Sequence, residues 1–275
     1  MPKQQKRHAP GWDALATWYD GWVGAEGSDH HRKWAIPAAL DLLDLRPNER
    51  LLDIGAGQGV LAPYIAQTGA KYTGVEISPR LLDIARKRHG RVGRFVQGDA
   101  RRLTSVRELA GTQFDAAVFL LSIQDMNPLE DVLRSAASLL RDGGRLVILM
   151  THPCFRVPRQ SGWGHDPARD LRFRRVDRYL NPLAVPMKQH ADAHRKRSDT
   201  NARPNARSDI AKGADSGVSI SFHRPLNHYV NGLADCGLLV SALREISAEG
   251  NGATPLEQRA NAEIPLFLGL KALKV

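Results

Sequence analysis

The stretch that decides the fold is RLLDIGAGQG, residues Arg50–Gly59. Its first half, Arg50–Ile54, has the short, mostly apolar character of a buried strand. It leads without a spacer into a turn with three glycines at alternate positions: Gly55, Gly57 and Gly59. Glycine lets the backbone adopt positive φ and lets a ligand approach where a Cβ would collide. A helix predicted to begin near Gln58 offers unpaired N–H groups to that ligand. Strand, glycine turn and helix together predict a site for a nucleotide-type ligand.

A second strand is predicted at Lys71–Val75, and the acidic residue Glu76 follows it. An acid about 20 residues after the glycine turn, at the carboxyl end of the next strand, is suited to bind the two hydroxyls of a ribose. The glycine spacing differs from the dinucleotide fingerprint GxGxxG. The third glycine comes one residue early, and Asp53 precedes the first glycine by two positions.

Asp53, the three glycines, Glu76 and the later motif GDARRL, which starts at Gly98, closely resemble the class I S-adenosylmethionine-dependent methyltransferases in order and spacing. The resemblance covers Leu51–Met150. It implies that S-adenosylmethionine is the cofactor, that the glycine turn surrounds its methionine part, that Glu76 binds its ribose and that Asp99 lies beside its adenine. The cofactor-binding residues expected on this basis are Tyr19, Asp53, Gly55, Gly57, Gly59, Glu76, Ile77, Asp99, Ala100, Leu121 and Ser122. An NAD-type domain and a non-catalytic relic are the alternatives.

Strands and helices continue to alternate after Glu76, with further strands predicted at Arg94–Gln97, Phe114–Leu121 and Arg145–Met150. Five strands interleaved with four helices indicate an open, doubly wound α/β sheet that binds ligands at the carboxyl ends of its strands. Two last strands are expected at 238–246 and 264–271. They complete the seven-stranded, mostly parallel, Rossmann-like sheet that the resemblance implies, with the final strand antiparallel near the edge.

The chain is expected to divide into four parts. Residues 1–48 form an N-terminal helical lid, 49–150 the cofactor-binding core, 151–217 an insertion on the substrate side, and 218–275 the last helix and two strands of the core sheet. The stretch 188–217 is polar and basic and is expected to be mobile. The lid residues placed to close over the cofactor are Tyr19, Asp20, His30, His31 and Arg32. The alternative is a packed amphipathic helix followed by a solvated loop.

Composition bounds the class of protein. A chain of 275 residues with 42% hydrophobic residues is typical of one soluble globular domain with additions, and no apolar run approaches a membrane span, so a cytoplasmic protein without membrane contact is expected. Its two cysteines, Cys154 and Cys236, lie in no Cys/His cluster, which predicts neither a disulfide framework nor a metal site. Residues 151–212 hold 14 Lys and Arg against 6 Asp and Glu, so most of the net charge of +10 belongs to the insertion.

The chemistry that the resemblance implies is displacement at an already activated methyl group. Alignment of the two reactants supplies about 7–11 kcal/mol of such a barrier, and a base is required only if the acceptor arrives protonated. Two histidines are candidates for that base: His152, just past the fifth strand, and His223. Each could instead be a structural histidine or a substrate contact. Cys154 lacks the surrounding motifs of the cytosine-C5 enzymes, which disfavours a covalent cysteine mechanism.

The predicted function is therefore methyl transfer to an O, N or C atom of a small molecule by in-line displacement. The acceptor is expected between Trp12–Arg32 and Phe155–Tyr179. The aromatic residues Trp163, Phe173 and Tyr179, together with nearby arginines, predict an aromatic or acidic acceptor. Methylation of RNA through the basic insertion and binding of S-adenosylmethionine without catalysis are the alternatives. The fourth strand lacks the Asn/Asp-Pro-Pro-Tyr/Phe signature of enzymes that methylate base nitrogens.

Overall fold

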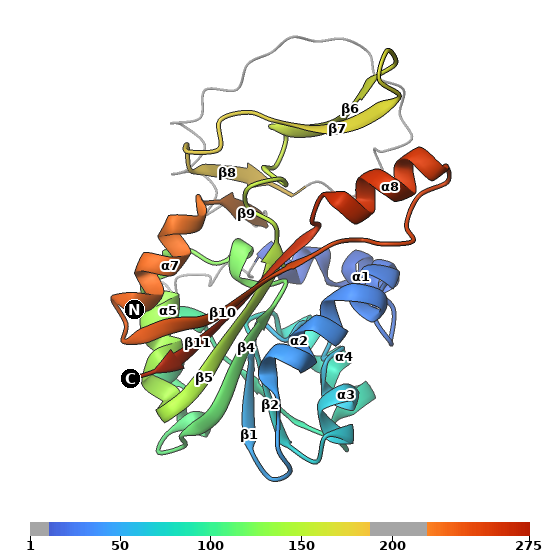
Figure 1. Cartoon of the computed structure of the whole chain (residues 1–275). Helices are drawn as coiled ribbons and strands as arrows, with labels where there is room; N and C mark the ends of the chain where they lie inside the picture. The colour runs from blue at the N-terminus through green and yellow to red at the C-terminus, as the bar shows by residue number, and fades with distance from the viewer. Residues whose placement is uncertain (1–10, 188–218) are drawn as a thin grey trace, which may run out of the picture.

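The computed structural model describes residues 11–187 and 219–275, and its centre is a seven-stranded sheet (Figure 1). The strand order is β10-β11-β5-β4-β1-β2-β3. β11 runs antiparallel to both of its neighbours, whereas the pairs among β5, β4, β1, β2 and β3 are all parallel. The strands are β1 (Arg50–Ile54), β2 (Lys71–Glu76), β3 (Arg94–Gln97), β4 (Phe114–Leu120), β5 (Leu140–Thr151), β10 (Leu238–Ile246) and β11 (Phe267–Lys274). This confirms the doubly wound sheet predicted from the sequence, with the last strand inserted between β5 and β10.

Helices cover both faces of the sheet (Figure 1). One face packs against α2 (Ile36–Leu43), α3 (Ala62–Gln67) and α4 (Pro79–His89), and the other against α5 (Leu129–Leu139) and α7 (Leu226–Ala234). The central strand β4 is buried along almost its whole length, so its apolar side chains contribute to both cores. This explains why Phe114–Leu120 is a continuous apolar run and does not alternate.

A local signal sets the start of α4. The Ser78 hydroxyl accepts the N–H of Leu81 and Pro79 occupies the first turn, so α4 begins where the sequence predicts. The helix expected near Gln58 begins instead at Ala62. The reason is that Gly57 and Gly59 have φ of +57° and +81°, and the chain between the glycine turn and Ala62 forms turns.

A smaller layer lies beyond the carboxyl ends of the parallel strands (Figure 1). It holds two antiparallel pairs, β6 (Ser161–Asp166) with β7 (Leu171–Val176) and β8 (Leu183–Pro186) with β9 (Ile220–His223), and the helix α8 (Pro255–Glu263). The N-terminal helix α1 (Gly11–Val23) and the π-helical turn His31–Ala35 approach the same end of the sheet. Within residues 11–187 and 219–275, no helix is long and apolar enough to cross a membrane.

Candidate functional site

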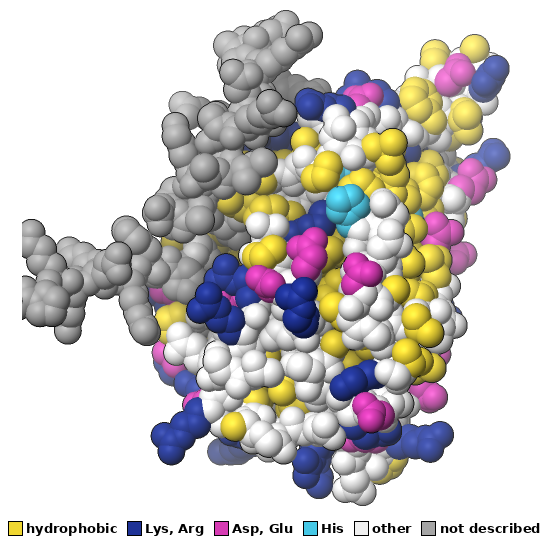
Figure 2. Space-filling view, turned by 90° about the vertical axis from the view of Figure 1, so that its left-hand side faces the viewer, with side chains coloured by type: hydrophobic (Ala, Val, Ile, Leu, Met, Phe, Trp, Pro, Cys, Tyr) yellow, Lys and Arg dark blue, Asp and Glu magenta, His cyan; other side chains and the backbone are white. Residues whose placement is uncertain are grey.

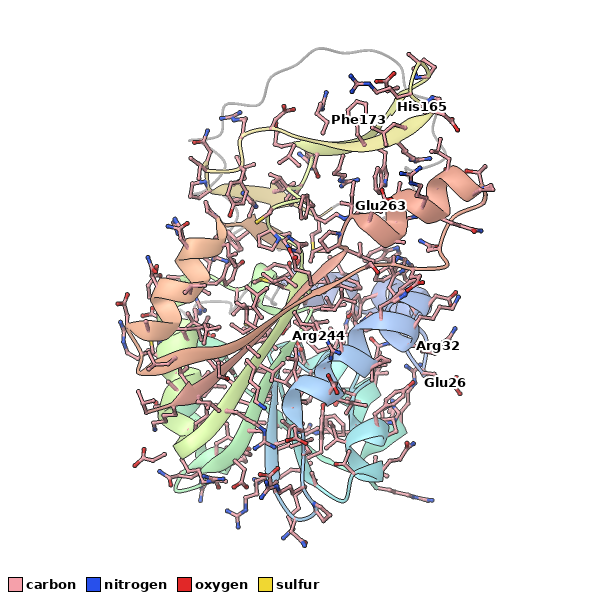
Figure 3. All side chains as sticks on the ribbon, viewed as in Figure 1. Glu26, Arg32, His165, Phe173, Arg244 and Glu263 are labelled. Atoms are coloured by element: carbon pink, nitrogen blue, oxygen red, sulfur yellow. The ribbon has the colours of Figure 1, made fainter. Side chains whose placement is uncertain are left out.

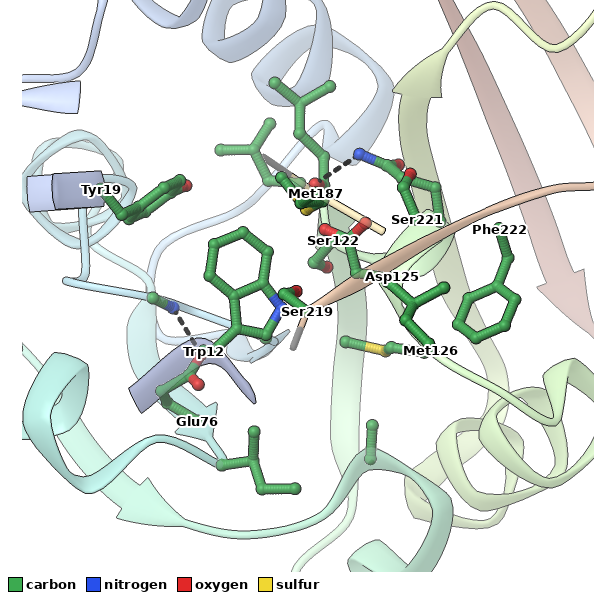
Figure 4. Close-up of a pocket in the computed structure, with 18 of the residues that line it drawn as sticks. Trp12, Tyr19, Glu76, Ser122, Asp125, Met126, Met187, Ser219, Ser221 and Phe222 are labelled. Atoms are coloured by element: carbon green, nitrogen blue, oxygen red, sulfur yellow. Dashed lines mark hydrogen bonds between the residues drawn. The ribbon is translucent and has the colours of Figure 1, made fainter. Parts of the chain in front are cut away.

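A cavity of about 820 Å³ opens at the carboxyl ends of β1, β2 and β4. This is where a doubly wound sheet binds its ligands, and the volume lies in the upper part of the range of about 300–1,000 Å³ for ligand sites. One half of its wall includes Gly55, Gly57, Glu76, Ile77, Asp99 and Ala100. The other half includes Asp125, Met126, Ser221 and Phe222 (Figure 4). The cavity is large enough for two ligands side by side.

The glycine turn after β1 forms the floor of the first half. Gly55 has φ of +76°, and a Cβ there would lie 2.6 Å from the Met126 methyl carbon. Gly57 has φ of +57°, and a Cβ there would meet only the ring of Tyr19, at 3.5 Å. Gly55 therefore allows the loop after β4 to pack closely, whereas Gly57 presents bare backbone to the cavity.

Glu76, at the end of β2, is only 5% exposed. One carboxylate oxygen accepts the N–H of Gly57 at 2.9 Å, and the other accepts the N–H of Ser78 at 2.8 Å. Burial raises the pKa of Glu76, and these backbone hydrogen bonds act in the opposite direction. Each oxygen has a second lone pair. The carboxylate can thus still accept hydrogen bonds from a ligand while it holds the glycine turn in place.

The residues after β2 and β3 extend this half of the cavity. Ile77, Asp99 and Ala100 lie on its wall, as the sequence predicts for a nucleoside pocket. The Asp99 carboxylate caps the following turn by accepting the Arg101 N–H at 2.9 Å, and it also forms an ion pair with the Arg101 guanidinium at 2.6 Å. The structure therefore places Asp99 at the site, with its charge already partnered by a neighbour.

Helix α1 covers the glycine turn from above. Tyr19 and Trp12 line the cavity, and their rings make an edge-to-face contact with centroids 5.2 Å apart. Figure 4 shows Trp12 beside Glu76, with Tyr19 at the left of the view, opposite Asp125. Burial is the main cause of a raised pKa at Tyr19, and the charges of Asp125, Glu76 and Asp53 raise it further. The Tyr19 hydroxyl therefore lies in a region of negative potential between the two halves of the cavity.

Two contacts fasten α1 to α4. The buried Asp13 carboxylate accepts the Ser78 hydroxyl at 2.8 Å and the Arg80 N–H at 3.0 Å, and Asp20 pairs with Arg88. Of the five residues expected in the lid, Tyr19, His30 and His31 lie on the cavity wall. Asp20 is instead part of the α1–α4 contact, and Arg32 is an exposed residue that pairs with Asp29 (Figure 3).

Leu121 and Ser122 lie on the wall as expected, at the end of β4. The Ser122 hydroxyl donates to the carbonyl of Ile54 at 2.7 Å, which ties the loop after β4 to the end of β1. Asp125 follows in a 3₁₀ turn and faces the cavity. Burial raises the pKa of Asp125 to about 7, while a hydrogen bond from Ser221 and the charge of Arg224 lower it. Figure 4 shows Ser122, Asp125 and Ser221 together on one side of the cavity.

Two of the expected cofactor residues lie behind the wall. Asp53 is 2% exposed and accepts the Tyr72 hydroxyl at 2.7 Å, and burial raises its pKa to about 7. A Cβ at Gly59 would lie 2.7 Å from the ring of Phe95 on β3, so this glycine lets the turn pack closely against that strand. Both shape the glycine turn from beneath, and neither lines the cavity.

The two histidines predicted as bases do not reach the main cavity either. His152 is buried, with Nε2 3.0 Å from a Glu245 oxygen and Nδ1 accepting the Cys154 N–H at 3.2 Å. His223 directs Nε2 at the Tyr179 carbonyl at 2.7 Å, so this nitrogen carries the proton and donates. These contacts give both rings structural positions. We therefore do not retain either as the base, and Asp125 is the titratable group nearest to that role.

The acceptor side also differs from the expectation. None of residues 155–179 lines the cavity. Trp163 packs among the guanidinium groups of Arg156, Arg172 and Arg174, and Phe173 is 42% exposed on the β6–β7 hairpin (Figure 3). Strand β9, the segment around Met187 and the start of β11 take their place on the wall. Residues 155–179 therefore do not reach the cavity, and the aromatic residues of β6 and β7 have no periodicity that reveals which face is covered.

On the face shown in Figure 2, the described residues form no continuous basic patch, because Lys and Arg side chains are interspersed with Asp and Glu. The basic stretch 188–217, which the sequence predicts to be mobile and which an RNA methyltransferase would use to contact RNA, lies outside the described residues. Within the described residues, no group of three or more His, Cys, Asp or Glu could hold a metal ion.

Asp125 is the main residue that the sequence reasoning did not assign. Its position at the carboxyl end of a central parallel strand is a signal that sequence alone contains. No comparable sequence signal predicts that Ser221 and Phe222 line the cavity, because β9 lies about one hundred residues further along the chain.

Comparison with known proteins gives a consistent result. Residues 52–148 match a family model described as a methyltransferase domain. The demethylmenaquinone methyltransferase of Tropheryma whipplei (strain Twist) is 36% identical over 117 residues, which are 42% of this chain and 48% of that protein. The ubiquinone biosynthesis O-methyltransferase of Xanthomonas oryzae pv. oryzae (strain PXO99A) is 31% identical over 154 residues, or 54% of this chain and 63% of that protein. The matches thus span about half to two thirds of these relatives.

The fold is also shared with solved structures. A putative S-adenosylmethionine-dependent methyltransferase from Listeria monocytogenes superimposes with a TM-score of 0.63 at 20% identity, covering 88% of this chain and 96% of that one. At this identity the likeness concerns the fold. Because it covers 88% of this chain, it extends beyond residues 52–148.

Proposed function

We propose that this chain, whose core is a class I S-adenosylmethionine-dependent methyltransferase domain, transfers a methyl group from S-adenosylmethionine to a small molecule with an aromatic part. The observation that carries the proposal is the single cavity with two unlike halves. One half is a glycine turn with a buried acid, and the other is apolar and aromatic with one carboxyl group. A methyl donor and an acceptor that bind in these halves meet beside Tyr19.

The residues present fit S-adenosylmethionine. Gly57 presents backbone where a side chain would fill the cavity, and the Glu76 carboxylate keeps free lone pairs that face a ribose. Ile77, Asp99 and Ala100 line the end of this half, where an adenine would lie. The carboxyl groups of Glu76 and Asp125 surround Tyr19 and favour a positively charged ligand group. We assign the sulfonium to this region.

S-adenosylmethionine supplies an activated methyl group, so the protein has to align the acceptor with it and exclude water. Holding the two reactants in an attack geometry accounts for about 7–11 kcal/mol of such a barrier. Helix α1 covers the donor half through Trp12 and Tyr19, and we propose that α1 with the turn after it acts as a lid. Its anchors on α4, at Asp13 and Asp20, hold it in the closed position.

The acceptor half sets the class of substrate. Met126 and Phe222 give it apolar and aromatic walls, which suit a flat ring. Of two relatives that match part of the chain, one is named a demethylmenaquinone methyltransferase and the other a ubiquinone biosynthesis O-methyltransferase. Aromatic hydroxyl compounds are therefore the first acceptors to test, together with aromatic amines.

The function is tested in two steps with the full chain. Titration calorimetry with S-adenosylhomocysteine should give saturable binding, and radiolabelled S-adenosylmethionine should then transfer label to small molecules of a fractionated cell extract. Failure to bind S-adenosylhomocysteine would remove the proposal. Label that enters RNA instead of small molecules would redirect it to nucleic acid.

A further inference from the structure

Resting on the proposed function, we propose that Asp125 is the general base of the reaction and that the acceptor is a phenol or an enol whose hydroxyl it deprotonates. Neither histidine singled out in the sequence reaches the main cavity, whereas Asp125 lines it. Its carboxyl group lies with Ser122 and Ser221 on the acceptor side, across the cavity from Tyr19 (Figure 4). An acceptor hydroxyl placed between these groups lies next to both the base and the donor half.

The loop that carries Asp125 is held on three sides. Ser122 donates to the Ile54 carbonyl at 2.7 Å, and the Gln124 side-chain amide donates to the Leu121 carbonyl at 2.7 Å. Arg224, which is 7% exposed, donates from Nη2 to the Met126 carbonyl at 2.7 Å and to Asn127 Oδ1 at 3.0 Å. These bonds fix the backbone on both sides of Asp125. The carboxyl group therefore has a defined position, as a base requires.

The groups that face Asp125 come from β9 and the residue after it, from α1 and from α7. Ser221 on β9 donates a hydrogen bond to it, and Arg224, just after β9, attracts its charge. Tyr19 on α1 and Tyr229 on α7 are close enough for its charge to raise their pKa values. Burial outweighs the first two groups and places the pKa of Asp125 near neutrality, at about 7. At that pH the carboxyl group is present in both forms, which suits a group that accepts and then releases a proton.

Acidity selects the class of acceptor hydroxyl. A phenol, with a pKa of about 10, can pass its proton to such a base as the oxygen begins to react. An alkyl hydroxyl has a pKa near that of water, about 16, which is too far above the pKa of the base for this transfer. A carboxylic acid is already ionised and needs no base. An ammonium acceptor would add a second positive charge beside the sulfonium. The aromatic walls agree with a phenol or an extended enol.

The acceptor O–H bond breaks and its proton passes to a carboxylate oxygen of Asp125. The oxygen lone pair forms a bond to the methyl carbon while the methyl–sulfur bond breaks and leaves its electron pair on sulfur. The products are the methyl ether, neutral S-adenosylhomocysteine and one proton, which Asp125 releases to water when the products leave. No further reactant is required.

The test compares wild type with Asp125→Asn on a series of para-substituted phenols, from para-nitrophenol to para-methoxyphenol, with labelled S-adenosylmethionine. The variant should lose about 10²–10⁴-fold in kcat/KM on the weakly acidic phenols. The loss should be less than tenfold on para-nitrophenol, which is largely ionised near neutral pH. Asp131→Asn, which changes a carboxylate on the outer side of α5 that pairs with Arg134, is the matched control and should follow wild type. Asp125→Glu, which keeps a carboxylate, should restore much of the activity on weakly acidic phenols.

Two readouts are independent of turnover. Calorimetry should give Asp125→Asn nearly the wild-type affinity for S-adenosylhomocysteine. Infrared spectra of the wild-type S-adenosylhomocysteine complex, with the spectra of the Asp125→Asn complex subtracted so that the band of Asp53 cancels, should show a carboxylic acid band that disappears as pH rises through about 7. Equal loss on every phenol, or no loss, would overturn the role of Asp125. Transfer to amines or carboxylates but to no phenol or enol would overturn the inference and leave the proposed methyl transfer standing, whereas a wild type that does not bind S-adenosylhomocysteine would remove both.

Discussion

The carboxylate of Glu76 accepts a hydrogen bond from the main-chain N–H of Gly57 at 2.9 Å, across 19 residues of sequence. This bond joins the end of β2 to the glycine turn that follows β1. One side chain therefore has two tasks, because it shapes the turn and also faces the cavity where a ribose would lie.

Glu76→Ala should weaken S-adenosylhomocysteine binding about 10–100-fold, since hydrogen bonds to a charged acceptor contribute about 1.5–3 kcal/mol. It should also lower stability, because the N–H groups of Gly57 and Ser78 lose their acceptor. Calorimetry and denaturant unfolding measure the two effects. Glu26→Ala changes an exposed glutamate near the end of α1 and should change neither (Figure 3). Wild-type affinity in Glu76→Ala would contradict the ribose assignment.

Gly57→Ala and Gly59→Ala should separate binding from stability. Both positions have positive φ, which costs a residue with a Cβ about 1–2 kcal/mol. At Gly57 the new methyl group projects towards the cavity, so affinity for S-adenosylhomocysteine should fall at least tenfold with little further loss of stability. At Gly59 it would lie 2.7 Å from Phe95, which adds about 1–3 kcal/mol of destabilisation by overpacking. If both variants lost affinity equally and remained equally stable, the distinction would be wrong.

Asp13→Ala should release α1 from α4. The Ser78 hydroxyl and the Arg80 N–H both lose their acceptor, at a cost of about 1–3 kcal/mol. Hydrogen exchange measured by mass spectrometry should become faster in Gly11–Val23 and stay unchanged in the central strand β4. Thr17→Ala, at an exposed position of the same helix, is the control. Unchanged protection of α1 in the Asp13 variant would argue against a hinged lid.

Ser221→Ala should move the pH dependence of turnover. The Ser221 hydroxyl bond lowers the pKa of Asp125, so its removal lets burial raise that pKa further. The rising limb of kcat/KM against pH should shift upward by about one unit, as one pKa unit corresponds to about 1.4 kcal/mol. Ser241→Ala, on the edge strand β10, should leave the profile unchanged. A reduced rate with an unshifted profile would mean that Ser221 only contacts the acceptor.

Stability without ligand should respond to pH through Asp53 and Asp125. Burial raises both pKa values to about 7, so between pH 4 and 7 the folded state holds more protons than the unfolded state. These two groups therefore make the free energy of unfolding fall as pH rises through this window and level off above pH 7. Buried histidines such as His31, whose pKa burial lowers to about 4, act in the opposite direction. The measurement is thus the free energy of unfolding of wild type minus that of Asp53→Asn, obtained by denaturant unfolding from pH 5 to 8. This difference should fall as pH rises to 7, because the wild-type carboxyl group loses its proton and the amide does not. It changes sign if the buried amide is better tolerated than the buried carboxylate.

Most of the donor half could be predicted from the sequence because its parts are local. Gly55, Gly57, Glu76, Ile77 and Ala100 lie at or shortly after the carboxyl ends of β1, β2 and β3, and the carboxyl ends of parallel strands meet at one edge. Even here the sequence did not decide which residues face the ligand. Gly59 and Asp53 belong to the same motif but lie beneath the turn, against Phe95 and Tyr72.

The sequence by itself determined the alternating α/β fold, the glycine turn and the acid after β2, because each depends on contacts within a strand and its neighbouring turn. Only the tertiary structure decided the acceptor half. Asp125 becomes a candidate base because Ser221 and Arg224, about one hundred residues later in the chain, approach it. His152 is not a candidate because its Nε2 contacts the Glu245 carboxylate. The physical reason is that burial and partnership decide what a titratable side chain can do, and both arise from segments that meet only when the chain has folded.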